Sequence, residues 1–159
     1  MNGGLRALAV ALELEHGAAY NPGNHELVDI AVEWAREPGP EGRPRLEDTS
    51  TLTRIARVKA NAYMKELIAK RAMYFGVTHP GRRTAYGPMN KLFGSEAYQR
   101  DMADLIDLAA PDSLFHGRDG VGPIELRHRH AQIATIYGGT SEVHRSMVAE
   151  NGLGLPRSR

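Results

Sequence analysis

The sequence contains no cysteine, which excludes disulfide bonds, thiolate catalysis and thiolate metal sites. It has no marked excess of charge of either sign, because 20 lysines and arginines against 19 aspartates and glutamates give a formal net charge of +1. A general attraction to nucleic acid or to an anionic membrane is therefore not expected. No apolar run approaches the length of a membrane span, and the N-terminus lacks the pattern of a secretory signal. We expect a cytoplasmic protein whose anion-binding groups, if present, are local.

The remaining composition is that of an ordinary globular domain. The chain has 159 residues, of which 42% are hydrophobic and 25% charged. That length is sufficient for a substantial core and predicts one domain, residues 1–159.

Apolar residues recur at three- and four-residue spacing through most of the chain, as expected of helices that bury one face. No alternating strand pattern and no internal repeat is present. We therefore predict an all-α fold, an up-and-down four-helix bundle with additional C-terminal helices. The predicted helices span residues 3–19, 25–37, 51–75, 89–110, 124–137 and 140–151.

The first predicted helix is apolar nearly all round and carries Glu15 on its apolar face. Leu8, Leu12, Glu15 and Ala19 fall on one stripe, whereas Glu13 is turned about 200° away from it. A carboxylate whose pKa is raised by burial suits general-base catalysis at neutral pH. From the residues alone, the more ordinary alternative remains a glutamate near a helix end that reaches solvent.

Two adjacent glycines, Gly138 and Gly139, interrupt the helical pattern near the C-terminus. Thr140, Ser141 and Glu142 follow them and favour the start of a new helix. The free N–H groups and the dipole of a helix start favour a nearby phosphate or other anion, and glycine permits close approach. A simple joint between two helices is the alternative interpretation.

Three further patterns are weaker. Residues 117–122 look like a phosphate-binding glycine loop, but they follow a helix and lack the Lys-Ser or Lys-Thr that would come next. His128 and His130 diverge on a helix and would not converge on one metal ion, so we predict no metal site. No nucleophile motif supports Ser–His–Asp catalysis. The charged residues of the 51–75 helix are interpreted as its solvated face: Lys59, Lys65, Glu66, Lys70 and Arg71.

Residues 136–145 have the sequence IYGGTSEVHR and are followed by MVAENGLGLPR. This stretch closely resembles the C-terminal signature of the acyl-CoA dehydrogenases, flavoproteins that oxidise acyl-CoA thioesters to trans-2-enoyl-CoA in fatty acid metabolism. The resemblance covers the C-terminal helical domain of that family and not its N-terminal helical and middle β-domains. It implies FAD as cofactor, acyl-CoA as substrate, an electron-transfer flavoprotein as reoxidant, and a homo- or hetero-oligomer that needs the missing domains or a partner.

The resemblance also implies roles for particular residues. Family members carry the catalytic base either directly before the Gly-Thr of the signature or on the first long helix of this domain. Gly138 stands at the first place, and the segment 14–16, Leu-Glu-His, resembles the family's Leu-Glu-Arg at the second. Glu15 is therefore implied as the base, and Gly139, Thr140 and Glu142 are implied to contact the adenosine and pyrophosphate of FAD. The alternative function is a catalytically silent helical bundle that serves as an oligomerisation or partner-binding module.

Overall fold

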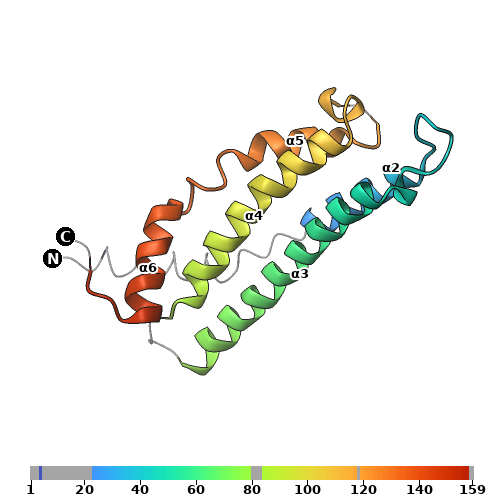
Figure 1. The fold of residues 1–159 in the computed structure, drawn as a ribbon. Coiled ribbons are helices and arrows are strands. Elements are labelled where there is room, and N and C mark those ends of the chain that lie inside the picture. Colours follow the sequence, from blue (N-terminus) through green and yellow to red (C-terminus); the bar gives the residue numbers. More distant parts are fainter. Residues whose placement is uncertain (1–3, 5–22, 80–83, 118, 158–159) are drawn as a thin grey trace. The chain divides into compact units, whose positions relative to one another are not determined.

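The computed structural model describes residues 4, 23–79, 84–117 and 119–157, so the helix predicted over residues 3–19 lies outside the described part. No strand occurs in these ranges, and the all-α prediction is confirmed. In the same ranges, no helix is both long and apolar enough to cross a membrane. The described α-helices, labelled in Figure 1, are α2 (Gly23–Arg36), α3 (Thr49–Thr78), α4 (Tyr86–Leu108), α5 (Gly122–Ala131) and α6 (Ser141–Leu153), with short 3₁₀ helices η1 (Arg45–Glu47) and η2 (Asp112–Leu114).

A capping side chain sets the start of α3. The backbone N–H of Thr51 donates to Oδ2 of Asp48 at 2.7 Å, and this bond holds the pKa of the Asp48 carboxyl below its usual range. α4 begins three residues before the predicted Met89, at Tyr86, and ends at Leu108, shortly before Pro111.

One predicted boundary is wrong. The helix expected over residues 124–137 ends at Ala131, six residues early, and turns lead from there to the two glycines. The N–H groups of Ile133 and Ala134 bond three residues back, and the Thr135 carbonyl accepts from the N–H of Ser141 at 3.1 Å. These bonds three residues back, in place of four, take the backbone out of the α-helix after Ala131, although the apolar periodicity of the sequence continues.

The chain divides into two compact units. Within the described ranges, unit 1 comprises residues 4, 64–79, 84–96 and 135–157, and unit 2 comprises residues 23–63, 97–117 and 119–134. α3 and α4 each supply a segment to both units. The units are described separately below.

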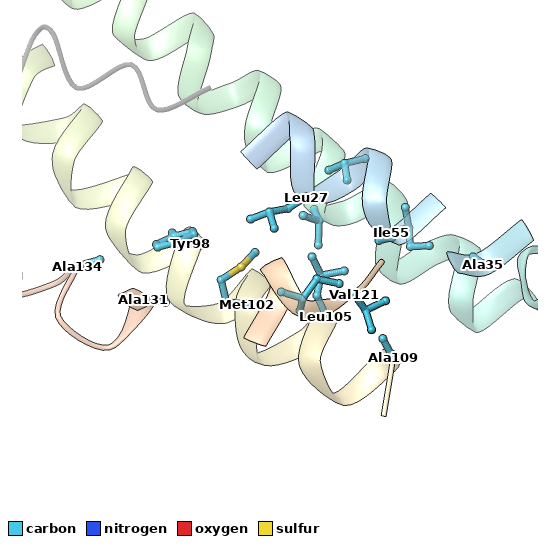
Figure 2. Close-up of a cluster of buried hydrophobic side chains, with 14 residues drawn as sticks. Leu27, Ala35, Ile55, Tyr98, Met102, Leu105, Ala109, Val121, Ala131 and Ala134 are labelled. Carbon is cyan, nitrogen blue, oxygen red and sulfur yellow. The ribbon is translucent and has the colours of Figure 1, made fainter. Parts of the chain in front are cut away.

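Unit 2 holds the buried apolar cluster of the described residues. Leu27 of α2, Val58 of α3, Met102 and Leu105 of α4, and Ile124 of α5 are each at most 1% exposed. Figure 2 shows Leu27, Met102 and Leu105 pointing toward one another within this cluster. Full burial of one such side chain contributes about 1.5–3 kcal/mol, so this cluster is the main described source of apolar stabilisation.

Unit 1 is different in kind, because the large side chains buried in its described part are polar. Asn90 and His144 are 1% and 0% exposed, and Ser95 and Ser141 are also buried. Large apolar side chains of the same unit lie at the surface: Met64, Leu67, Met73, Tyr74, Val77, Met89, Ile136, Tyr137, Val143, Leu153 and Leu155.

Candidate functional site

The glycine turn of unit 1, Gly138-Gly139, has a backbone that only glycine adopts without strain. Its φ angles are +65° at Gly138 and +98° at Gly139. A side chain at either position would cost about 1–3 kcal/mol in backbone strain alone. The local structure explains why the sequence has two glycines here, independently of any ligand.

His144, on α6, packs against this turn. Its imidazole is fully buried, and Nε2 lies 3.0 Å from the carbonyl oxygen of Gly138. A Cβ at Gly139 would lie only 2.8 Å from the same Nε2. The sequence analysis assigned no role to His144; the available signal was its position three residues after Ser141, on the one face of α6 that is buried.

The backbone groups at the start of α6 form most of their hydrogen bonds with residues of the same segment. The Thr140 hydroxyl accepts from the N–H of Val143 at 3.4 Å, and the Thr140 carbonyl accepts from the N–H of His144. Glu142 is exposed, and bonds from its own backbone N–H and then from the Thr140 side chain keep the pKa of its carboxyl below the usual range. The helix start therefore already carries an ionised carboxylate, which complements the helix dipole.

Two lysines lie beside the turn. Nζ of Lys91, on α4, is 3.5 Å from the Gly139 carbonyl oxygen and 5.3 Å from the centroid of the Tyr137 ring. The stem of Lys65, on α3, packs where a side chain on Gly94 would approach its Cε to 3.0 Å. Burial lowers the pKa of both lysines, and the charge of Lys91 lowers that of Lys65 further. The interpretation of Lys65 as part of a solvated face is wrong, because its side chain is half-buried.

The structure places three of the four predicted site residues on one short segment. Gly139 and Thr140 are half-buried and Glu142 is exposed at the start of α6. Glu15 lies outside the described residues, so its predicted role as base is untested. The cofactor contacts implied for the other three likewise remain predictions.

The glycine loop near Gly117 is held by side chains of unit 2. Gly117 and Gly120 have φ angles of +67° and +77°, as expected of turn residues. Glu125 is buried, with Oε2 at 3.0 Å from Nδ1 of His116 and Oε1 paired with Arg129. These two partners, His116 first, lower the pKa of the Glu125 carboxyl. Within the described ranges, histidines and acids form no group of three or more that is suited to a metal ion.

Comparison with known proteins gives consistent matches. The family described as "Acyl-CoA dehydrogenase, C-terminal domain" matches residues 10–153. Acyl-CoA dehydrogenase FadE26 of Mycobacterium tuberculosis is 33% identical over an alignment of 139 positions, which covers 79% of this chain and 33% of that protein. The chain therefore spans about a third of the length of this curated relative.

The fold of the chain also matches those of solved structures. The ChsE4-ChsE5 complex from Mycobacterium tuberculosis aligns with a TM-score of 0.75 and 27% identity, over 86% of this chain and 36% of that chain. A variant of the Tcur3481-Tcur3483 steroid ACAD aligns with a TM-score of 0.83 and 26% identity, over 99% of this chain and 42% of that chain. In each case the part that matches is less than half of the longer protein.

Proposed function

Because the chain belongs to the acyl-CoA dehydrogenase family, whose C-terminal domain it carries, we propose that it takes part in the flavin-dependent α,β-dehydrogenation of an acyl-CoA thioester to the trans-2-enoyl-CoA. The observation that carries this proposal is the match of that domain over residues 10–153. Since the chain spans a third of its curated relative, we propose that other segments or another chain complete the active site. We also propose that residues 1–159 are one domain, because α3 and α4 run unbroken through both units.

Glu15 is the general base in this proposal. It removes the proton from the carbon next to the thioester carbonyl, and FAD, when bound, supplies the hydride acceptor. The alternative place for a base has no carboxylate, because Gly138 stands there with a φ of +65° that disfavours other residues. Burial on the apolar stripe of its helix would raise the pKa of Glu15 toward neutrality, as proton abstraction at that pH requires.

The residues at the start of α6 fit the adenosine end of FAD better than its pyrophosphate. The lowered pKa keeps Glu142 ionised at neutral pH, so its carboxylate is an acceptor for ribose hydroxyls or for the adenine amino group. The Thr140 hydroxyl can share in the same contacts, and Gly139 leaves room for the ligand next to the backbone. A carboxylate would repel a phosphate group at this point.

The partners follow from the relatives and from the surface of unit 1. Both aligned structures are named as two-component proteins, which supports the proposal that this chain assembles with a second acyl-CoA dehydrogenase subunit. Leu67, Tyr74 and Val77 are 65%, 63% and 81% exposed, and apolar side chains this exposed favour coverage by another protein surface. We propose an electron-transfer flavoprotein as reoxidant and the cytoplasm as location.

A spectroscopic experiment tests the function. The chain is purified together with the proteins that bind it in its own host, and a flavin spectrum that bleaches on addition of an acyl-CoA is expected. Glu15→Gln should retain the flavin and lose the bleaching, because only the proton acceptor is removed. Glu13→Gln is the matched control on the same predicted helix and should still bleach.

Two outcomes would contradict the proposal. A colourless assembly that stays unchanged with added FAD and acyl-CoA would favour the silent, partner-binding bundle instead. Bleaching retained in Glu15→Gln would leave the family reaction standing and remove Glu15 as its base.

A further inference from the structure

Two helices of unit 2, α3 and α4, form an open cleft of about 510 Å³. Its lining includes three arginines and three aspartates, whose charges would cancel if every group were ionised. The pairing within the cleft decides which of these charges remain for a partner. No residue of this cleft has a role in the proposed function.

Two carboxylates of the cleft are already paired with arginines. Asp104 accepts from Nε of Arg54 at 2.8 Å and also pairs with Arg57. Asp107 accepts from a second N–H group of Arg54 at 2.7 Å. Arg57 nevertheless remains 60% exposed, and Arg100 is exposed and has no ion pair within the described ranges. The cleft therefore offers guanidinium N–H donors to a partner rather than free surface carboxylates.

The third carboxylate, that of Asp101, is buried in the wall of the cleft. Asp101 is 2% exposed, and Oδ1 accepts from Nδ2 of Asn61 at 2.8 Å, whereas Oδ2 has no hydrogen-bond partner in the described structure. Burial raises the pKa of this carboxyl from 3.8 to about 6. The bond from Asn61 and the charges of the neighbouring Arg100 and Arg57 oppose this rise, and the charge of Asp104 adds to it. A proton on Asp101 would leave the cleft with one positive charge in excess.

This arrangement favours an anionic partner whose binding is coupled to a proton. A partner's carboxylate can accept paired hydrogen bonds from a guanidinium group, and arginine is enriched in protein interfaces. The same negative charge would disfavour the ionised form of Asp101, so binding and protonation support each other. We propose that the cleft docks an acidic segment of a partner protein, that Arg57 and Arg100 bind its carboxylates, and that Asp101 takes up a proton on docking.

Fluorescence anisotropy with a labelled hexa-aspartate peptide and the intact 159-residue chain at low salt tests the inference. We expect binding about fivefold tighter at pH 5.5 than at pH 8, because the peptide is ionised at both values while Asp101 is mostly protonated only at the lower one. At pH 5.5, Arg100→Met should weaken binding about fivefold. Lys59→Met is the matched control, since it removes an exposed cation of α3 outside the cleft, and its affinity should stay within about twofold.

A second variant isolates the proton. Asp101→Asn keeps an acceptor for Asn61 and is neutral at both pH values, so it should bind as tightly at pH 8 as at pH 5.5. Calorimetry of the wild-type chain in two buffers of different ionisation enthalpy should show net proton uptake on peptide binding near pH 6.5, which Asp101→Asn lacks. The wild-type measurement does not depend on whether a variant folds well.

Three results would overturn the inference: no binding of hexa-aspartate at either pH, an equal loss of affinity in Arg100→Met and Lys59→Met, or a pH dependence that persists in Asp101→Asn. Binding of a hexalysine peptide that is lost in Asp101→Asn would assign the cleft to a basic partner instead and would equally overturn it.

Discussion

The two units of this chain differ in the surroundings of their partly buried cations. In unit 2, Arg54 donates through Nε to Asp104 at 2.8 Å and through a guanidinium N–H to Asp107 at 2.7 Å, and the buried Glu125 is paired with His116 and Arg129. In unit 1, Lys65 and Lys91 lie close together and burial lowers the pKa of each.

The difference separates the unit that supplies most of the described apolar burial from the unit that contains the candidate site. Unit 2 combines the apolar cluster around Met102 with charges that neutralise one another, as expected of a region that stabilises the fold. In the described part of unit 1 the large buried side chains are the polar Asn90 and His144, and Lys65 and Lys91 lie near each other; neither feature maximises stability. Natural proteins keep such features where a ligand or partner uses them.

The largest expected effect tests the glycine turn of unit 1 against a turn of unit 2. Gly139→Ala should lower the free energy of unfolding by about 3 kcal/mol, because the new methyl group meets a φ of +98° and would lie 2.8 Å from Nε2 of the buried His144. Gly120→Ala, at a φ of +77° with no atom within 4 Å of the new Cβ, should cost only about 1 kcal/mol. Urea unfolding of both variants measures the difference in unfolding free energy. Equal losses of stability would mean that the His144 ring moves aside without an energetic cost.

The second prediction concerns the exception within unit 2. Asp101 is 2% exposed and accepts from Nδ2 of Asn61 at 2.8 Å through Oδ1, while Oδ2 has no hydrogen-bond partner in the described structure. Burial raises the pKa of this carboxyl from 3.8 to about 6. The folded state therefore holds the proton more tightly, so the stability contributed at low pH is lost as pH rises from about 4 to about 6.

Asp101→Asn should remove this dependence. The amide keeps the acceptor for Asn61 and avoids the buried charge, so we expect a gain of about 2–3 kcal/mol at pH 8 and almost none near pH 4. Asp107→Asn is the control, because Asp107 is 75% exposed and pairs with Arg54; it should give no gain at pH 8. Urea unfolding at the two pH values measures both, and a gain that is equal at pH 4 and pH 8 would refute the burial explanation.

The sequence predicts those helix boundaries that depend on local signals. Helix positions follow from periodicity and caps, which are local, so α3 after Asp48 and α6 after Thr140 were found closely. The end of α5 at Ala131 was missed, because the apolar periodicity continues to Tyr137 while the N–H groups of Ile133 and Ala134 bond only three residues back. Sequence alone gives no signal that decides against helix there.

The site was predicted in part for the same reason. The two adjacent glycines make the turn visible in the sequence. The roles of His144 and Lys65 are not visible there, because burial of each side chain depends on which helix face is buried in the fold. Lysines on a helix are usually solvated, so Lys65 was assigned to the solvated face. Only the packing of its stem at Gly94 distinguishes it from Lys59.

The third prediction sharpens the comparison through the lysine pair. Lys65→Met should raise the free energy of unfolding at pH 7, by less than about 1 kcal/mol since the side chain is only half-buried, while Lys59→Met should change it little. The pKa of Lys65 is lowered in the folded state, so the penalty on the wild type is full at neutral pH, falls as pH rises through the lowered pKa and disappears above 10.5. Unfolding of both variants and the wild type at pH 7 and near pH 10 measures the trend. A loss of stability in Lys65→Met would show that this lysine is structural.

The smallest expected effect separates capping from ligand binding at Thr140. Its hydroxyl accepts from the N–H of Val143 at 3.4 Å, which is long for a capping bond, so Thr140→Ala should cost only about 0.5 kcal/mol, at the low end for a cap. Thr140→Ser keeps the hydroxyl and should match the wild type. If Thr140 also contacts the adenosine of FAD, Thr140→Ala weakens FAD binding by more than this small change in stability explains, and Thr140→Ser restores it. Thermal unfolding and flavin titration on the same samples separate the two roles of Thr140. If the threonine serves only as a cap, its loss changes the stability and the FAD affinity by similarly small amounts.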